Sequence, residues 1–288
     1  MQLGIVTPAL TVLPRAHAAW EEAATFDQVV DIVRAAERLG YHHCTCSEHV
    51  AVPVSVATVR GGCYWDPLAT FGFLAAQTTS IRFATHVLVL GYHHPLEIAK
   101  RYGTLDVVSG GRLILGVGVG SLEEEFALLD APFADRGARA DDAMRALRAA
   151  LSQREPEYSG EYYEFSEFLV DPCAVQAHVP LWVGGRTARS LRRAVELADG
   201  WAPFGLSLDD IAGCLTRARE SEAWHARTGA FEVILPTDPP LDPMDEPEAT
   251  ADTVAAYSDA GATMLNVRVI HHSPAHYVEQ LEALRTIV

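Results

Sequence analysis

The sequence lacks the features that mark membrane or secreted proteins. Its apolar runs, such as residues 87–90, are far too short to cross a bilayer. The first residues carry no basic region followed by a long apolar stretch, so we expect no signal peptide. Cysteine is scarce and odd in number, at five, and no Cys-x-x-Cys occurs. These absences favour free thiols in a reducing cytoplasm over a disulfide framework or a zinc site.

Basic residues are also fewer than acidic residues. The chain has 22 Lys and Arg against 38 Asp and Glu, which gives a formal net charge of -16. Nucleic acids and anionic membranes need a basic surface, so neither is an expected partner. An anionic small molecule held by a few local arginines remains compatible with this charge.

Short apolar strands alternate with amphipathic segments of helical length throughout the 288 residues. Residues 152–180 interrupt this rhythm with a predicted hairpin at 158–163, and they are too few to hold a core of their own. Eight strand–helix units in this length favour one (β/α)8 TIM barrel over residues 1–288, rather than a doubly wound sheet. The predicted strands are Leu3–Pro8, His43–Ser47, Ile81–Leu90, Leu113–Val117, Leu181–Val183, Gly200–Ala202, Phe231–Leu235 and Met264–Val269.

The active site of such a barrel lies where its strands end at their carboxyl termini. Glu48 and His49 follow the second strand and pair a carboxylate with an imidazole, which suits polar contacts to a ligand ring and acid–base work. The structural alternative is a loop pair at a helix entry. A glycine run, Gly116-x-Gly118-x-Gly120, leaves the fourth strand and permits close approach of a planar ligand. Its spacing differs from the Gly-x-Gly-x-x-Gly of a dinucleotide fold.

The segment after this glycine run is interpreted structurally. Ser121 and Glu124 have the spacing of a helix capping box. The helix dipole alone accounts for three consecutive acids, Glu123 to Glu125, at a helix start.

Gly184-Gly185-Arg186-Thr187 joins the fifth strand to a predicted helix. Free N–H groups, a hydroxyl and a guanidinium at a helix N-terminus can bind a phosphate. The alternative is a tight turn in which Thr187 is only the N-cap. From the residues alone, both interpretations stay open.

Three histidine pairs suggest a metal at first sight: 42–43, 93–94 and 271–272. Neighbouring residues of a strand face opposite ways, so such a pair rarely gives two ligands to one ion. Histidines on the surface or in hydrogen-bonded loops are the favoured interpretation, and no metal site is predicted.

Several of these blocks together resemble the luciferase-like flavin and deazaflavin barrels, and most closely the coenzyme F420-dependent oxidoreductases among them. The similarity runs from about Leu3 to Phe204. The blocks that carry it are Leu39-Gly40-Tyr41 with Glu48-His49, residues 81–87, 94–100, 105–118 and 180–186, and Ala198-Asp199-Gly200-Trp201.

The resemblance implies a role for each matching position. Glu48 and His49 would face the polar edge of the deazaflavin ring. Thr85, His86 and Val87 would lie against the ring, with a non-prolyl cis peptide at His86–Val87. Gly118 and Gly120 would line the cofactor channel, and Gly184, Gly185, Arg186 and Thr187 would bind the phosphate. His49 or His86, with Glu48, would serve catalysis.

Two departures from the family pattern affect the site. Glu48 stands where the family usually has Asp, and His86 replaces a usually small residue. The sugar-phosphate dehydrogenase branch carries a catalytic Glu near the position of Ser121, so its reaction is not expected here.

Four hypotheses follow. The first is a coenzyme F420-dependent oxidoreductase that passes a hydride to or from an activated C=C, C=N or C=O group. The others are an FMN-dependent monooxygenase, a metal-dependent hydrolase or isomerase using Glu48, His49 and His271, and a binding protein without cofactor.

The substrate and the assembly are predicted only in outline. Aromatic and apolar loops around Tyr64, Trp65, Phe133, Phe204 and residues 236–247 predict a small, mostly apolar substrate. A homodimer is expected by analogy with other barrels.

Overall fold

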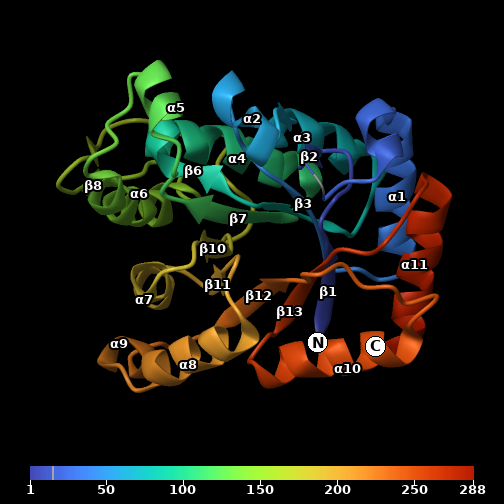
Figure 1. Ribbon diagram of the computed structural model, residues 1–288. Coiled ribbons are helices and arrows are strands. Elements are labelled where there is room, and N and C mark those ends of the chain that lie inside the picture. The colour runs from blue at the N-terminus through green and yellow to red at the C-terminus, as the bar shows by residue number, and fades with distance from the viewer. Residues whose placement is uncertain (15) are drawn as a thin grey trace.

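The computed structural model describes residues 1–14 and 16–288, and its centre is a closed ring of eight parallel strands (Figure 1). Strand β1 pairs with β13 through Leu3 and Leu265, and the ring closes where Val183 pairs with Val117. The predicted (β/α)8 barrel is therefore confirmed. In ring order the strands are β1 (Gln2–Ile5), β3 (His43–Cys46), β5 (Arg82–Thr85), β7 (Leu113–Gly118), β10 (Leu181–Gly184), β11 (Gly200–Ala202), β12 (Glu232–Pro236) and β13 (Met264–Val267).

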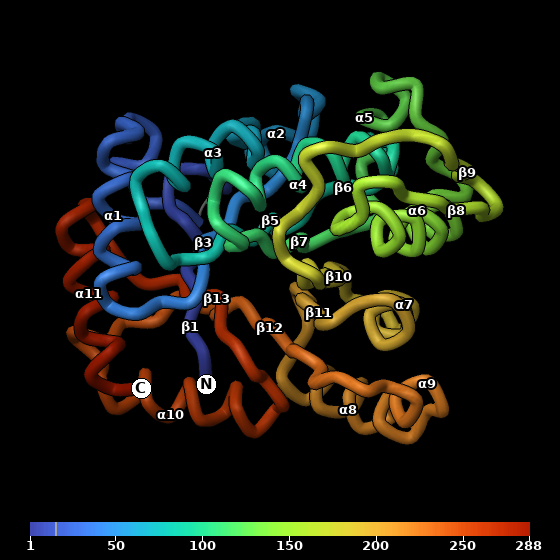
Figure 2. Tube along the Cα trace, turned by 180° about the vertical axis from the view of Figure 1, so that it is seen from behind, coloured from blue at the N-terminus to red at the C-terminus, as the bar shows by residue number. Residues whose placement is uncertain are grey.

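Helices lie around the outside of this ring, as the trace in Figure 2 shows from behind. Helix α1 illustrates why they form: Thr25 caps it, and Val29, Ile32, Val33 and Ala36 are buried on one face. The main helices are α1 (Phe26–Arg38), α3 (Pro67–Gln77), α4 (Pro95–Ser109), α6 (Arg136–Ala150), α7 (Ala188–Leu197), α8 (Leu208–Arg219), α10 (Pro247–Asp259) and α11 (Pro274–Ile287).

Small elements decorate the loops between strands and helices. A two-stranded sheet pairs Thr11 with Tyr64, and a hairpin in the 152–180 insertion pairs Tyr158 with Phe165. The elements are β2 (Thr11–Val12), η1 (Ala19–Ala23), α2 (Val54–Arg60), β4 (Cys63–Tyr64), β6 (Leu88–Val89), η2 (Leu90–Tyr92), α5 (Glu123–Leu128), β8 (Tyr158–Ser159), β9 (Glu164–Phe165) and α9 (Glu222–His225).

Side chains fill the inside of the barrel itself. Ala84, Ile114, Trp182, Ile234 and Met264 belong to one buried cluster contributed by different strands. This packed interior is typical of the fold, in which the barrel is a core and not a pore. Space for a ligand is therefore expected only beyond the strands' carboxyl ends.

The structure corrects three local predictions. The third predicted strand, 81–90, is interrupted after Thr85. The sequence pattern of residues 208–227 predicts one helix, but these residues form α8 and the short α9, which Ser221 caps. The capping box of Ser121 and Glu124 is wrong, because α5 starts after Leu122 and has no side-chain cap. Ser121 instead accepts a hydrogen bond from Arg60 at 3.0 Å. None of the described helices is long and apolar enough to span a membrane.

Candidate active site

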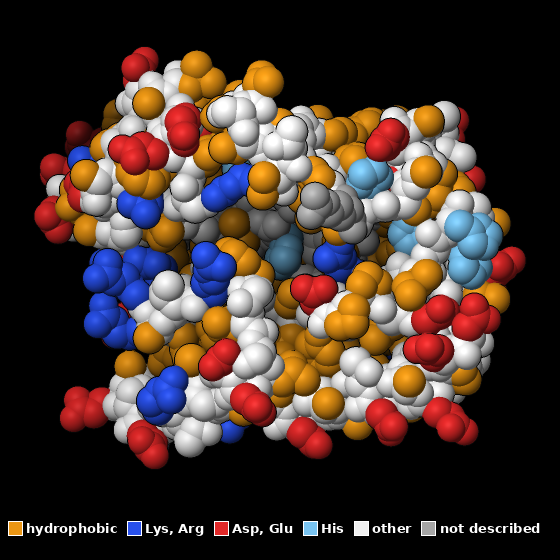
Figure 3. All heavy atoms as spheres, viewed as in Figure 1, with side chains coloured by type: hydrophobic (Ala, Val, Ile, Leu, Met, Phe, Trp, Pro, Cys, Tyr) orange, Lys and Arg blue, Asp and Glu red, His pale blue; other side chains and the backbone are white. Residues whose placement is uncertain are grey.

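A cavity of about 600 Å³ opens at the carboxyl ends of the strands. Figure 3 shows this face hollowed near its centre, with charged and histidine side chains around the hollow. Both its size and its position are those of a small-molecule site in a barrel. Its lining comes from the ends of six strands and includes Thr7, Thr45, Ser47, His86, Phe204, Leu235, Asp238, Arg268 and His271.

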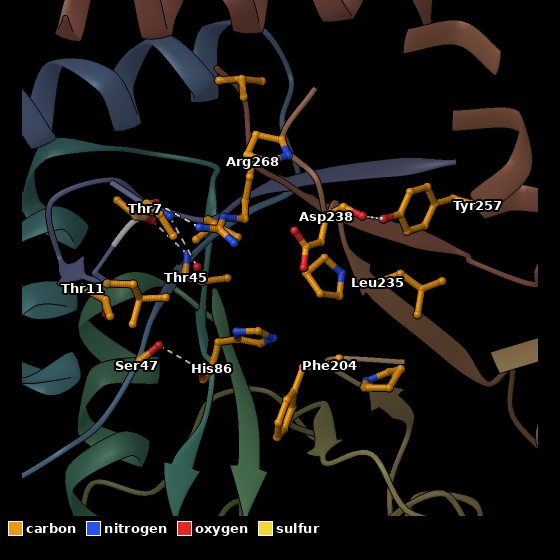
Figure 4. Close-up of a pocket in the computed structure, with 18 of the residues that line it drawn as sticks. Thr7, Thr11, Thr45, Ser47, His86, Phe204, Leu235, Asp238, Tyr257 and Arg268 are labelled. Atoms are coloured by element: carbon orange, nitrogen blue, oxygen red, sulfur yellow. Dashed lines mark hydrogen bonds between the residues drawn. The ribbon is translucent and has the colours of Figure 1, made fainter. Parts of the chain in front are cut away.

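A break in the third barrel strand brings His86 into this cavity. The peptide bond between His86 and Val87 is cis, as the family resemblance predicts. Contacts on both sides hold the break: the His86 N–H donates to the Cys46 carbonyl at 2.8 Å, and the Ser47 hydroxyl donates to the His86 carbonyl at 2.8 Å. The imidazole of His86 points into the cavity (Figure 4).

The imidazole of His86 has no hydrogen-bond partner among the described residues, so both of its nitrogens are available to a ligand. Burial lowers the pKa of His86 to about 4. His86 is therefore a neutral imidazole at pH 7, able to donate one hydrogen bond and accept another.

The Val87 side chain packs against two of the predicted cofactor glycines. A Cβ atom on Gly118 would lie 2.6 Å from a Val87 methyl carbon, and one on Gly184 would lie 2.7 Å from the other. These glycines therefore make room for Val87. A Cβ on Gly120 would meet the ring of Phe126 at 2.4 Å. The glycines are required for close packing behind the break in the strand.

Glu48 is buried beside the same break and does not line the cavity. One carboxylate oxygen accepts from the Val89 N–H at 2.7 Å, and the other contacts His93 Nε2 at 2.7 Å. Burial by itself would lower the pKa of His93. The hydrogen bond and the charge of Glu48 outweigh this effect, so the pKa of His93 is raised. Glu48 thus fixes the chain just after the cis peptide.

His49 is held by an acid that the sequence analysis missed. Its Nδ1 lies 2.6 Å from a carboxylate oxygen of Glu125, and its ring packs edge-on against Tyr64. Glu125 is 1% exposed and also accepts from Tyr92 and from the Val50 N–H. The helix-dipole explanation is therefore wrong for Glu125. Its helical spacing to the apolar Leu122 and Leu129 was the sequence signal that it faces inward.

The predicted phosphate loop follows β10 as expected. The hydroxyl of Thr187 accepts from the Ser190 N–H at 3.2 Å, so Thr187 is the N-cap of α7. The Thr187 N–H is also occupied, since it donates to the Ser190 hydroxyl. The backbone N–H groups of Gly185 and Arg186 have no acceptor among the described residues, and Arg186 is exposed. Two N–H groups and a guanidinium at this helix start are thus free for an anion.

Two further arginines lie at the end of the neighbouring strand β7. Arg136 Nε donates to the Gly120 carbonyl at 3.2 Å, and Arg60 contacts Ser121. Arg60 ends α2 and Arg136 begins α6, and both contact the loop after β7, the strand that pairs with β10 ahead of Arg186. Figure 3 shows basic side chains gathered on one side of the hollow. A cationic edge thus exists within a strongly acidic chain.

The residues proposed for a metal do not meet. Glu48 and His49 have the partners described above, whereas His271 accepts from the Trp20 indole at 3.0 Å and lies 3.6 Å from Glu21. Within residues 1–14 and 16–288, no group of three His, Cys, Asp or Glu residues is arranged to hold an ion.

The sequence and the fold both match known proteins. A family model described as luciferase-like monooxygenase matches residues 1–286. An uncharacterized protein of Mycobacterium tuberculosis is 30% identical over 270 residues, covering 87% of this chain and 91% of that protein.

Two solved structures share the fold over 100% of this chain and 98% of theirs. Monooxygenase RslO1 from Streptomyces bottropensis has a TM-score of 0.80 at 20% identity. The coenzyme F420-dependent tetrahydromethanopterin reductase of Methanopyrus kandleri has a TM-score of 0.75 at 15% identity. With its family match over nearly the whole sequence, the chain belongs to the luciferase-like monooxygenase family of barrel oxidoreductases.

Proposed function

We propose that the protein is a coenzyme F420-dependent oxidoreductase that moves a hydride between the deazaflavin and a small organic substrate. The observation that carries this proposal is the cationic edge formed by Arg60 and Arg136 at the loop after β7 and by Arg186 after the adjacent β10. The deazaflavin cofactor has an acidic tail beyond its phosphate. It therefore needs more cations than FMN, and this edge supplies them in a chain of net charge -16.

The residues present fit such a cofactor. The phosphate would bind the free N–H groups of Gly185 and Arg186, and the Arg186 guanidinium. A Cβ placed on Gly205 would lie 3.9 Å from Arg186 Nη1, and Gly205 lines the cavity, so the loop adjoins the cavity mouth. Thr85, His86 and Val87 would support the ring from the strand break. At about 600 Å³ the cavity has room for a three-ring system and a small substrate.

When bound, the deazaflavin supplies hydride chemistry, taking up or giving back two electrons and a proton together. The chain's part is to hold the substrate and handle the accompanying proton. His86 is neutral and faces the cavity, so it can take a proton from an alcohol or hydrogen-bond a carbonyl oxygen. His49, oriented by Glu125 but not among the residues that line the cavity, is the second candidate for this role. Glu48 acts indirectly, by fixing the strand break.

An FMN-dependent monooxygenase is the second candidate function. It is favoured by the family's own description and by the fold shared with monooxygenase RslO1. Titration of the purified protein with oxidised deazaflavin and with FMN, followed by absorbance and fluorescence, separates the two. We expect the deazaflavin to bind at least about tenfold more tightly. Tight FMN binding without deazaflavin binding would overturn the proposal.

The cationic edge can be tested by substitution. We expect Arg136→Met and Arg186→Met each to weaken deazaflavin binding about tenfold or more, because each removes a charge-assisted contact to the acidic tail. The matched control is Arg192→Met, which removes an exposed arginine of α7 that pairs with Glu196. It should bind normally. Denaturation curves of Arg186→Met and Arg192→Met should resemble the wild type, whereas Arg136→Met also loses its bonds to the Gly120 and Phe133 carbonyls. A stability loss in Arg186→Met that parallels its affinity loss would favour a purely structural role.

A further inference from the structure

Arg268 is a cation in the cavity wall without a charged partner. It follows β13, and its half-buried side chain extends towards the centre of the cavity (Figure 4). Its Nη2 donates to the Ala16 carbonyl at 3.0 Å, and its other guanidinium N–H groups have no acceptor in the part of the chain that the structure describes. Among the described residues, no carboxylate oxygen lies within 4.0 Å of its guanidinium nitrogens.

The two acids that line the cavity do not neutralise this charge. Glu21 is buried, and its oxygens accept from the Ala9 and Ala18 N–H groups, both at 2.7 Å. Asp238 is exposed and forms no ion pair with Arg268. A half-buried guanidinium loses solvation without gaining a counter-ion, so an anion in the cavity would be favoured there.

The ring order places this cation away from the proposed phosphate loop, which follows β10, three strands from β13. Going round the barrel from β13, the strands are β1, β3, β5 and then β7, so β13 and β7 lie on opposite sides. Arg268 thus follows the strand opposite β7, whose following loop Arg60 and Arg136 contact. His86, on the break after β5, lies between β13 and β7 in the ring order. Arg268 is therefore placed for a second anion.

We propose that Arg268 binds a carboxylate of the substrate, so that the enzyme acts on a small organic acid. This names the substrate class of the proposed oxidoreductase and rests on that function. The carboxylate would sit at Arg268 and the reacting carbon near His86. The remainder would lie against the apolar wall formed by Phe204, Leu206 and Leu235. The predicted apolar substrate is thereby refined to an apolar acid.

Matched acid and amide pairs test this inference, because they differ in charge and hardly in shape. The probes are butanoate and butanamide, 2-hexenoate and 2-hexenamide, and cinnamate and cinnamamide. Binding is measured by calorimetry on the protein alone and on the protein loaded with oxidised deazaflavin. We expect at least one acid to bind about tenfold or more tightly than its amide. Arg268→Met should abolish this preference and Arg268→Lys should keep part of it.

The outcomes distinguish the two proposals. Deazaflavin binding without any preference for an acid overturns the role of Arg268 and leaves the proposed function intact. An acid preference that depends on Arg268 in a protein unable to bind deazaflavin supports the anion site and overturns the proposed function. If Arg268→Met weakens deazaflavin binding as much as Arg136→Met does, Arg268 holds the cofactor and the inference is wrong. Melting curves show whether Arg268→Met is folded. If it is not, the preference of Arg268→Lys for acid over amide tests the inference in its place.

Discussion

Glu125 is the residue on which the surroundings of His49 depend. It is buried, and it accepts hydrogen bonds from His49, Tyr92 and the N–H groups of Val50 and Ala51. Burial raises its pKa, but these hydrogen bonds outweigh burial and the pKa of Glu125 is lowered. It is therefore ionised at neutral pH and acts as a positioning residue for His49.

Replacing the Glu125 carboxylate by an amide tests whether its negative charge, and not only its shape, is needed to position His49. Glu125→Gln keeps the shape, but it puts an NH2 group where an acceptor is needed. We expect a loss of about 1–3 kcal/mol in the free energy of unfolding, measured with urea. Turnover should fall and its pH profile should change, while deazaflavin affinity stays the same. Glu124→Gln is the control, because Glu124 is the exposed neighbour on the same helix. Equal effects of the two substitutions would contradict the role of Glu125.

At the scale of residues, the sequence predicts local features and misses distant partners. The N-cap at Thr187 follows from a short motif and the cis peptide at His86–Val87 from the family resemblance, and both are present. The contacts of Glu48 with His93 and of His49 with Glu125 join residues 45 and 76 positions apart. No local pattern encodes such pairs. The adjacent Glu48 and His49 therefore looked like one unit, although each has its own partner.

At the scale of elements, the predicted strands and helices are largely present, but the residue pattern alone did not reveal their interruptions, and only the family resemblance pointed to one at His86–Val87. Residues 81–90 are nearly all apolar or small, which is typical of a continuous buried strand. The break after Thr85 comes from contacts with other strands: the Thr85 hydroxyl donates to the Gly116 carbonyl at 2.7 Å, and His86 donates to Cys46. A sequence pattern cannot reveal contacts that depend on neighbouring strands.

The contact between β5 and β7 gives a prediction at this scale. A Cβ on Gly116 would lie 1.9 Å from the Thr85 carbonyl oxygen, which is backbone and cannot move aside alone. We expect Gly116→Ala to destabilise the protein by about 1–3 kcal/mol or more, since overpacking forces the strands apart.

The measurement is urea denaturation, with Gly72→Ala as its control. Gly72 is an exposed helical glycine whose added Cβ would contact nothing within 4 Å. That variant should be stabilised by about 0.5–1 kcal/mol, because alanine loses less entropy in a helix than glycine does. A Gly116→Ala protein as stable as the wild type would show that β5 and β7 can separate at little cost.

For the whole molecule, the alternation and the length were enough to predict the barrel. Eight strand–helix units can close into a barrel or form an open sheet, and eight units in a chain of this length are typical of the barrel. Of the arrangement of charge, only Arg186 was predicted. A net charge of -16 gives no sign of the arginines beside β7 and β10, nor of Arg268 across the barrel. These residues are far apart in the sequence, and only closure of the ring brings them around one cavity.

Three histidines kept neutral in the folded protein predict how its stability depends on pH. Burial, followed by the charge of His42, lowers the pKa of His43 to about 3. Burial is also the main cause that lowers the pKa of His42 and of His86 to about 4. Unfolded histidine has a pKa of about 6.5. Between these values the unfolded chain binds protons that the native protein does not, so acid favours unfolding.

The expected result is a free energy of unfolding that is steady above about pH 7 and falls as the pH is lowered from about 6.5 to 5. His43, which is fully buried, should contribute up to about 1.4 kcal/mol per pH unit. Urea denaturation at several pH values measures this slope. His43→Gln should make it shallower, whatever its effect on absolute stability. The control, His225→Gln at an exposed position of α9, should keep the wild-type slope. An unchanged slope in His43→Gln would mean that His43 is protonated in the folded protein, and its contact with Asn266 would then involve an imidazolium.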